Sequence, residues 1–363
     1  MRKSVISAAI FALAVCCAPT LKAQEAAAAK YKVNFYGQIK SDIIYDVHGM
    51  FGDDYSQYVL SKKDAERDFR ASARGTRFGL DITDGDKVSA KIETDFLGVT
   101  DGASATDLRL RHAYVTLKAG KLEILSGQTW HLLPLEFSGT NNEFAMGNSG
   151  VLWMRAPQLR LTYKADDKIT LAAAMVRPTR KLIDAEGTAS GLPQGQVQAQ
   201  VKLGKTKLTL MGAAGQWRNT TTGKKADVHL VDFGYNIPLN SVLTLNGQLW
   251  TGQNLYDFLG GSGNVNGYGS AKVKASGGFA NISVKPAGRF SYNVAYGIDN
   301  PMDSNLAAAS RVKYSTLMAN ATCMVYEKVS VTLETASQET DYKKVGGDKR
   351  SNLHYQLSFK FPF

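Results

Sequence analysis

The sequence predicts an all-β fold: a transmembrane, antiparallel up-and-down β-barrel of about 16 strands, with an inward-folded third long connector. Three features predict it: an apolar N-terminal segment, alternating apolar and polar residues, and connectors that are alternately short and long. The alternation is clearest in residues 352–363, which read NLHYQLSFKFPF. Large apolar side chains occupy every second position, namely Leu353, Tyr355, Leu357, Phe359, Phe361 and Phe363. A soluble sandwich would show the same period, but so aromatic a terminal strand is more typical of one that faces lipid.

The N-terminus has the features of a signal peptide. Arg2 and Lys3 supply positive charge, residues 5–18 are apolar, and Leu21-Lys22-Ala23 fits a small-residue cleavage site. A membrane-spanning helix needs about 20 apolar residues, and this run is shorter. We therefore expect cleavage of this segment and a mature start near Gln24.

Cleavage defines the domain organisation that we expect. The alternative is a lipoprotein acylated at Cys16 or Cys17, although Val15 is larger than lipoprotein signals usually allow. We see no shift of composition later in the chain, so we expect one folded domain. The expected parts are a signal peptide at residues 1–23, a short periplasmic lead-in at 24–32 and an outer-membrane barrel at 33–363.

Charge and cysteine content limit the partners and the covalent links. The chain of 363 residues has a net charge of +11, and removal of the three basic residues of the signal peptide leaves +8. Such a charge suits anionic partners and equally a solvated surface, and no nucleic-acid motif accompanies it. Only Cys323 remains after cleavage, so the mature chain has no internal disulfide. No later segment approaches 18 uninterrupted apolar residues, so we expect no membrane-spanning helix.

Alternation and connector length together predict the strand number. Residues 33–47, 88–96 and 194–203 alternate with period two, which a helix would not do. Seven short turns and eight long loops separate sixteen strands, and an outer-membrane barrel sorts its connectors in this way. The expected turns are 84–86, 119–120, 166–167, 204–205, Asn236 to Asn240, 286–288 and 326–328. The expected loops are 49–70, 99–107, 131–153, 178–192, 218–226, 252–267, 298–309 and 338–349.

The third long connector, about 131–153, is the candidate constriction loop. An aqueous lumen gains its selectivity from lumen charges and from any loop that narrows it. The polar candidates in this loop are Glu136, Asn141, Asn142 and Glu143, and the expected apolar anchors are Leu132, Leu133, Leu135 and Phe137. An ordinary external loop is the alternative.

Basic residues on neighbouring strands are the candidate selectivity residues. Arg109 and Arg111 lie two apart, on the face opposite Leu108 and Leu110. An arginine that faces lipid near the bilayer midplane costs roughly 2–4 kcal/mol, so we expect both to face the lumen. Further candidates for a cationic wall opposite acidic loop residues are Arg74, Arg77, Lys91 and Arg160, of which Arg74 shares its parity with Phe78. The alternative is an unspecialised solvated wall balanced by Glu93 and Asp95.

The sequence gives little support to an enzyme, and we expect no cofactor or metal. The histidines are scattered without metal-ligand spacing, at His48, His112, His131, His229 and His354. A lipid-acting barrel enzyme would need a serine and a histidine on the lipid face. His112 shares its parity with Leu110 and so is expected on that face, but no serine accompanies it.

Three segments together resemble one known family. They are Ser72–Gly79 (SARGTRFG), Leu108–Val115 (LRLRHAYV) and Gly127–Trp130 (GQTW), and the likeness is sharpest across residues 33–165. The chain resembles the trimeric outer-membrane porins of Gram-negative bacteria typified by the dicarboxylate-uptake, DcaP-like channels. That family can carry a helical periplasmic segment before the barrel, and residues 24–31 leave little room for one.

The resemblance implies a function and partners. It implies a homotrimer in the outer membrane that passes small anionic solutes, dicarboxylates among them, by passive diffusion. The aromatic end also resembles the signal by which the barrel-assembly machinery recognises its substrates, with Phe363 as the terminal residue. A non-conducting barrel used for adhesion or surface binding is the alternative interpretation.

Overall fold

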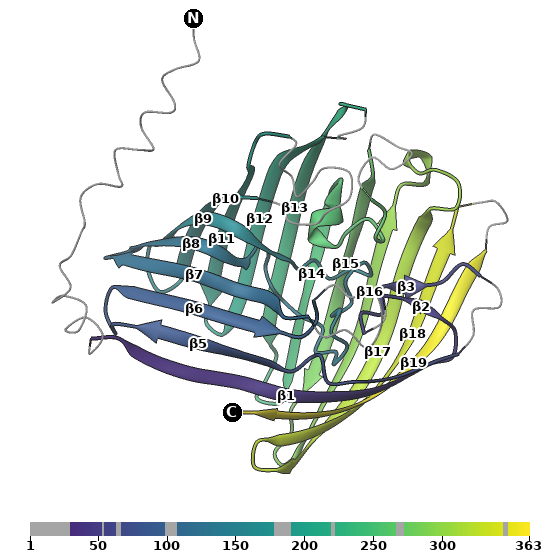
Figure 1. Cartoon of the computed structure of the whole chain (residues 1–363), viewed down its shortest axis with the longest axis horizontal. Helices are drawn as coiled ribbons and strands as arrows, with labels where there is room; N and C mark the ends of the chain where they lie inside the picture. The colour runs from purple at the N-terminus through teal and green to yellow at the C-terminus, as the bar shows by residue number, and fades with distance from the viewer. Residues whose placement is uncertain are drawn as a thin grey trace, which may run out of the picture.

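A computed structural model describes residues 30–52, 54–62, 67–98, 107–177, 190–218, 222–265, 272–343 and 348–363. Within these ranges the chain forms the predicted closed antiparallel barrel of 16 strand positions (Figure 1). The expected signal peptide, with Cys16 and Cys17, and the lead-in up to residue 29 lie outside the described residues. No helix within the described ranges is long and apolar enough to cross a bilayer.

The wall is built from seventeen strands, two of which share one position. β4 and β5 share it because β1 pairs with β4 through Asp42–Asp46 and with β5 through Lys32–Gln38. The strands are β1 Lys32–Asp46, β4 Asp68–Ser72, β5 Arg77–Thr83, β6 Val88–Asp95, β7 Arg109–Ala119, β8 Leu122–Trp130, β9 Arg155–Lys164, β10 Ile169–Val176, β11 Gln194–Leu203, β12 Thr206–Arg218, β13 Lys225–Pro238, β14 Leu243–Gln253, β15 Lys274–Val284, β16 Phe290–Pro301, β17 Arg311–Tyr326, β18 Val329–Tyr342 and β19 Lys349–Pro362.

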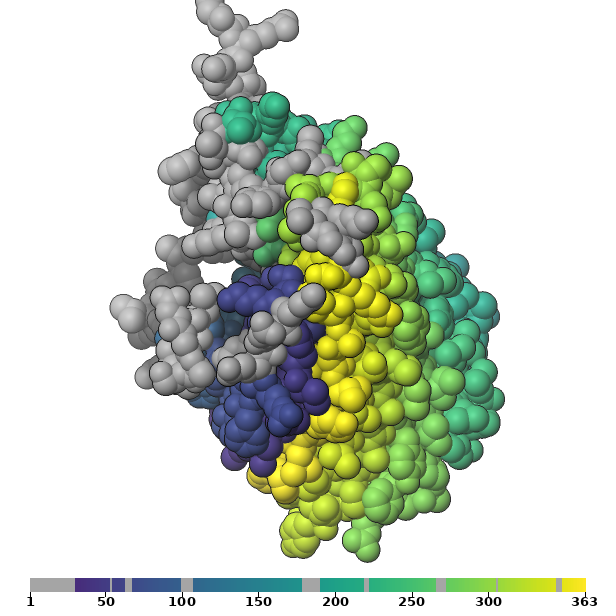
Figure 2. All heavy atoms as spheres, turned by 90° about the vertical axis from the view of Figure 1, so that its right-hand side faces the viewer, coloured from purple at the N-terminus to yellow at the C-terminus, as the bar shows by residue number. Residues whose placement is uncertain are grey.

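The first and last strands close the barrel. β1 pairs with β19 from Gln38 opposite Pro362 to Asp46 opposite His354. Figure 2 shows the first and last strands side by side along this seam, purple against yellow. Closure leaves no sheet edge, as the hydrocarbon core requires, because unpaired backbone groups find no water there.

Strand β19 shows the predicted alternation in the folded state. On one face Tyr355, Phe359 and Phe361 are 44%, 46% and 41% exposed, whereas on the other Gln356 and Ser358 are each 1% exposed. The apolar side chains therefore form the outer surface, and the polar side chains point into a filled lumen.

The short connectors gather at one end of the barrel, together with the start of β1 and the end of β19. Lys32 at the start of β1 pairs with Thr83, next to the 84–87 turn, and Lys360 near the C-terminus pairs with Ser330, next to the 327–328 turn. In the first of these turns the Asp84 carboxylate accepts the backbone N–H groups of Val88, Asp86 and Lys87, which lower its pKa to about 2. Such Asx contacts are typical of tight turns.

The turn predicted at Asn236 to Asn240 was placed too early in the chain. The Pro and Asn residues of Asn236 to Asn240 suggested a turn, but β13 continues to Pro238, which pairs with Thr244 at the end of the ladder. The turn is formed by residues 239–242, where the Asn240 side chain accepts the N–H groups of Val242 and Leu243. A proline at the last position of a strand removes a donor where its loss costs least.

Three of the long connectors fold into the lumen. The first carries the hairpin of β2 Met50–Phe51 and β3 Tyr58–Val59, and the sixth carries the 3-10 turn η2 Leu255–Phe258. A further 3-10 turn, η3 Asp303–Asn305, lies in the seventh. The third connector, residues 131–154, is folded inward as predicted. The inward folding of the first and sixth connectors was not predicted.

We expect removal of Phe363 to lower the yield of folded barrel. Its backbone exchanges two hydrogen bonds with Gly37, at 3.0 and 3.2 Å, and its ring lies 5.5 Å from that of Phe35. These contacts hold the end of the closing seam, and such an aromatic pair contributes about 0.5–1.5 kcal/mol beyond its burial. Deletion of Phe363, or Phe363→Asp, should reduce the heat-modifiable folded form in outer membranes. Wild-type yield in both variants would remove the terminal residue from the assembly argument.

Candidate functional site: a cationic constriction in the lumen

A cavity of about 310 Å³ lies between the third connector and the barrel wall. The wall residues come from strands at and near the closing seam: β1, β5, β7, β8, β9 and β19. The lining residues are Gln38, Lys40, Arg77, Arg109, Arg111, Trp130, Phe137, Gly139, Thr140, Asn141, Asn142, Glu143, Ala145, Trp153, Arg155 and Lys360. Six of them are cationic and one, Glu143, is a carboxylate, so the cavity is strongly basic.

The tip of the third connector is latched to the wall by one buried carboxylate. Glu334 of β18 is 1% exposed and accepts hydrogen bonds from the Thr140 hydroxyl at 2.5 Å and from the Asn141 backbone N–H at 2.6 Å. Asn320 of β17 donates to the same carboxylate at 2.9 Å and to the Gly139 carbonyl oxygen. These contacts fix how far the connector projects across the lumen.

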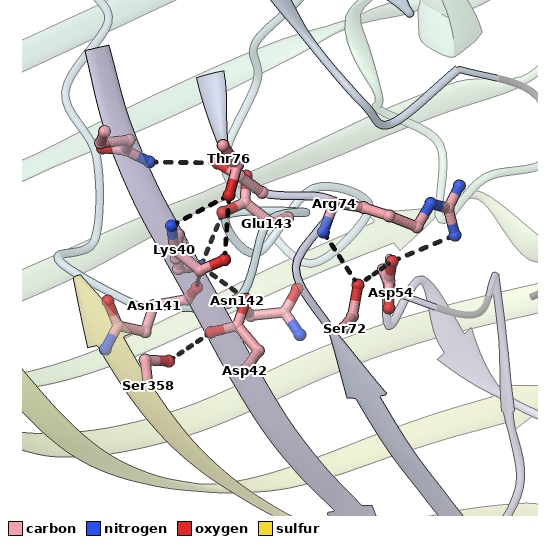
Figure 3. Close-up of polar contacts among 12 residues, drawn as sticks. Lys40, Asp42, Asp54, Ser72, Arg74, Thr76, Asn141, Asn142, Glu143 and Ser358 are labelled. Atoms are coloured by element: carbon pink, nitrogen blue, oxygen red, sulfur yellow. Dashed lines mark hydrogen bonds and ion pairs between the residues drawn. The ribbon is translucent and has the colours of Figure 1, made fainter. Parts of the chain in front are cut away.

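A second latch joins the connector to β1 (Figure 3). The Lys40 ammonium group contacts the Glu143 carboxylate at 2.6 Å and the Asp42 carboxylate at 3.1 Å, and it donates to the Asn141 carbonyl oxygen at 2.7 Å. Lys40 is therefore a cation whose charge is compensated by two carboxylates.

Glu143 belongs to a connector, and its surroundings lower the pKa of its carboxyl group. Burial by itself opposes ionisation, but the Lys40 ammonium group and then the guanidinium groups of Arg77 and Arg111 outweigh it and lower the pKa of this carboxyl. Because the folded-state pKa is the lower one, the contribution to stability is fully present above the ordinary carboxyl pKa. It is lost as the pH falls through the lowered pKa.

The two acidic residues of the connector separate in space. Only Glu143 faces the cationic wall. Glu136 is 5% exposed and pairs with Lys207 at 2.5 Å and with the Asn236 amide at 3.1 Å, on the opposite wall. The expectation that the acidic loop residues lie together opposite the arginines therefore fails for Glu136.

The other side of the connector packs against the wall in an apolar core. Leu132 and Leu133 are 2% and 1% exposed and pack with Leu152 and Phe258 against inward-facing residues of β10, β12, β13 and β14. Those wall residues are Ala174, Val176, Met211, Ala213, Trp217, Ala226, Val228, Leu230 and Trp250. Phe137, expected to be an anchor, is 37% exposed and lines the cavity instead. The cavity therefore lies on the side of the lumen that is next to the β1–β19 seam.

Arg109 and Arg111 lie in the lumen, and each is held by carboxylates of β6. Arg109 contacts Asp95 at 2.5 Å, and Arg111 contacts Glu93 at 2.5 Å and Asp95 at 2.7 Å. These charged hydrogen bonds hold both planar guanidinium groups in place. Glu93 and Asp95, which the alternative of an unspecialised wall invoked as balancing charges, therefore bind these arginines directly.

A β-bulge lies within the LRLRHAYV segment of β7, opposite β6. Glu93 pairs with His112 and Thr94 with Leu110, so Arg111 is the extra residue. The bulge reverses the alternation, and His112 faces the lumen, where its ring nitrogen meets the Thr129 hydroxyl at 3.0 Å. The expectation of a lipid-facing His112 is wrong, because period two was extended across a bulge.

Gln128 completes the bulge from the outside. It pairs in register with Ala113 on the outer face, and its amide donates to the Leu110 carbonyl oxygen at 2.7 Å. A buried or lipid-facing carbonyl without a donor would be costly. Gln128 and Thr129 of the GQTW segment thus form hydrogen bonds with residues at the bulge in LRLRHAYV.

Three cations of the lining were not singled out from the sequence: Lys40, Arg155 and Lys360. The Arg155 guanidinium lies over the Trp130 ring, 4.4 Å from its centre, and 5.8 Å from that of Trp153. Such a stack stabilises a cation in a confined site. Lys40 alternates with Gln38 and Asp42 on β1, a period-two signal that could have been found.

The remaining predicted cations lie outside this cavity. Lys91 pairs with Asp81 at 2.8 Å and with the Tyr36 hydroxyl. Arg160 donates to the Gln158 amide oxygen and to the Trp130 carbonyl oxygen. Arg74 belongs to the segment between β4 and β5 and pairs with Asp54 at 3.0 Å (Figure 3). Of the six predicted cations, the cavity brings together only Arg77, Arg109 and Arg111.

The first and sixth connectors brace the third. Asn142 donates to the Ser56 hydroxyl at 3.2 Å, and the Tyr55 and Phe144 rings lie 5.6 Å apart. From the other side the Asn148 backbone N–H donates to the Leu259 carbonyl oxygen at 2.9 Å. In the described part of the chain no cluster of His, Cys, Asp and Glu has the makings of a metal site.

A closed 16-strand barrel whose third connector narrows a charged lumen defines a channel of the porin class. A family profile described as "DcaP outer membrane protein" matches residues 13–206, which is more than half of the chain. The chain therefore belongs to the DcaP outer membrane protein family, and its place is the outer membrane. No curated protein sequence matches it significantly.

Solved porin structures share the fold. The outer membrane channel DcaP of Acinetobacter baumannii superposes with a TM-score of 0.77 at 20% identity, covering 92% of this chain and 98% of that chain. OmpF of Salmonella typhi, in complex with daunomycin, gives 0.61 at 10% identity with coverages of 92% and 98%. A trimer form of OmpT of Vibrio cholerae gives 0.58 at 12% identity with coverages of 92% and 99%.

We predict that Gln128→Leu destabilises the barrel. The change leaves the Leu110 carbonyl oxygen at the bulge without its donor, which costs about 1–3 kcal/mol. Unfolding in urea from lipid vesicles, followed by Trp fluorescence, should show a lower midpoint. Ser126→Leu, two residues earlier on the same outward face, is the matched control and should not lower it. Equal midpoints for both variants would contradict the role of Gln128.

We predict that Glu334→Ala loosens the constriction. The change removes the acceptor for Thr140 and Asn141, and hydrogen bonds to a charged group contribute roughly 1.5–3 kcal/mol each. Single-channel recording should show a larger and noisier conductance. Glu339→Ala, which removes a carboxylate of the same strand outside the cavity, is the control. An unchanged conductance in Glu334→Ala would mean that other contacts hold the connector.

Proposed function

We propose that this chain is a passive diffusion channel that prefers small hydrophilic anions, dicarboxylates among them. One observation carries the proposal: six cations line the cavity at the constriction, and the ion pairs described above supply them with four carboxylates. Positive charge in excess, in a narrow space with a low-dielectric wall, raises the local concentration of anions.

The size of the cavity supports a small solute. A volume of about 310 Å³ is at the lower end of the range of about 300–1,000 Å³ typical of small-molecule sites. Arginine suits carboxylates because its planar fork can donate two parallel hydrogen bonds. The ring faces of Trp130 and Phe137 in the lining leave one side of the space apolar. A small dicarboxylate, with charged ends and a short apolar carbon chain, suits a cavity lined by both cations and aromatic rings.

Several features belong to the same proposal. We propose a homotrimer, supported by the trimer form of the similar OmpT barrel. We propose export through a cleaved signal peptide at residues 1–23 and assembly through the aromatic C-terminus, both supported by sequence pattern. The Gram-negative outer membrane follows from the family, and lipid is the partner of the apolar outer face.

The purified protein in planar bilayers should conduct, with a reversal potential that indicates anion preference in a KCl gradient at modest salt. The preference should fade near molar salt, because the screening length falls from about 10 Å at about 0.1 M to about 3 Å at about 1 M. A barrel that does not conduct would favour the adhesion alternative. A cation preference at modest salt would contradict the anion channel while leaving the channel itself intact.

A further inference from the structure

Two lysines face each other across the closing seam. Lys40 of β1 pairs directly with Lys360 of β19, and both line the cavity. Like charges in directly opposed positions destabilise a sheet. The lysine pair therefore lowers the stability of the sheet, and a function of the two charges would account for it.

Only one member of this pair is compensated. Lys40 is held by Asp42 and Glu143, whereas among the described residues Lys360 has no ion pair and no side-chain hydrogen bond. Lys360 therefore presents its charge to the cavity.

Arg77 repeats this situation on the other side of β1. It pairs in register with Gln38, one strand away from the lysine pair, and lines the same cavity. Within the described ranges its guanidinium also has neither an ion pair nor a hydrogen bond. Arg77 and Lys360 lie on the two strands that flank β1, and neighbouring strands lie about 4.8 Å apart. Two side chains of this length can therefore both reach one small group between them.

The connector contributes an unsatisfied donor to the same space. The side-chain Nδ2 of Asn141 is buried and has no hydrogen-bond partner in the described part of the chain, and Asn141 lines the cavity. Glu334 and Lys40 hold the backbone of Asn141 in place. Buried polar groups are nearly always paired, and an orphan donor in the same cavity lining as two uncompensated cations indicates an absent acceptor.

We propose that Arg77, Lys360 and the Asn141 amide form an oxyanion-binding subsite at the constriction, which takes a carboxylate or phosphate group of the passing solute. The proposal rests on the proposed function in that the solute reaches the subsite by crossing the lumen. Arg109, Arg111 and Lys40, whose charges are held by carboxylates, then serve mainly to shape the wall. Binding by three groups is moderate, as conduction requires a solute that also leaves.

The test measures binding and conduction separately. Succinate and inorganic phosphate are titrated into the detergent-purified protein by calorimetry, and each is added to chloride-conducting channels in bilayers to measure block. Arg77→Gln and Lys360→Gln should each weaken binding and block by at least about tenfold, the equivalent of one lost charged hydrogen bond. Arg77→Lys, which keeps the charge, should recover part of the loss. Weakening for succinate alone assigns the subsite to carboxylates, and weakening for phosphate alone assigns it to phosphates.

Lys91→Gln is the matched control, since Lys91 faces the lumen but pairs with Asp81 outside the cavity. It should leave binding and block near wild type. An equal loss in Lys91→Gln would overturn the subsite in favour of a general lumen field, and unchanged binding in both Arg77→Gln and Lys360→Gln would overturn it outright. Heat-modifiability of every variant shows that the barrel is folded. Wild-type binding without conduction would contradict the proposed function alone, and anion-selective conduction without loss in the variants would contradict the subsite alone.

Discussion

The closing pairing of β1 with β19 is the constraint on which the rest of the structure depends. A sheet in lipid cannot leave an edge, so the first and last strands must meet in register. The seam brings the end of the chain next to its beginning, with Phe363 bonded to Gly37 and Gln356 bonded to Asp42. It also places Lys40 opposite Lys360, residues that are 320 positions apart in the sequence. The candidate site exists only because the barrel closes there.

The lumen is asymmetric, and this follows from which connectors fold inward. On the side of β10 and β12 to β14 the inner face of the wall carries many apolar residues, which pack against Leu132, Leu133 and Phe258. On the seam side the inner face carries the ion pairs of Asp95, Glu93 and their arginines. Burial of apolar surface thus holds the third connector on one side, and latches to Glu334 and Lys40 hold its tip on the other.

Much of this could be predicted from period two and connector length. Strand number, the end that carries the turns, the inward third connector and the lumen direction of Arg109 and Arg111 all depend on local pattern, which a sequence displays. The errors arose where local pattern fails. A bulge adds one residue and reverses the parity, which misplaced His112. The location of Glu136 and the inward folding of two further connectors depend on tertiary contacts that no local period encodes.

Local pattern also reveals which residues are charged, but it does not reveal which of these charges are paired in the folded barrel. Arg109 and Arg111 stand out in the sequence because they alternate with leucines, yet each is held by Asp95 or Glu93. Ion pairs of this kind shape a wall and cancel much of its field, since a charge and its counter-charge a few ångströms apart act at longer range as a dipole. Lys360 lies on the polar face of the aromatic terminal strand, and its position opposite Lys40 is known only from the closed barrel. The proposed selectivity therefore rests on which cations lack a carboxylate partner, more than on how many cations the strands carry.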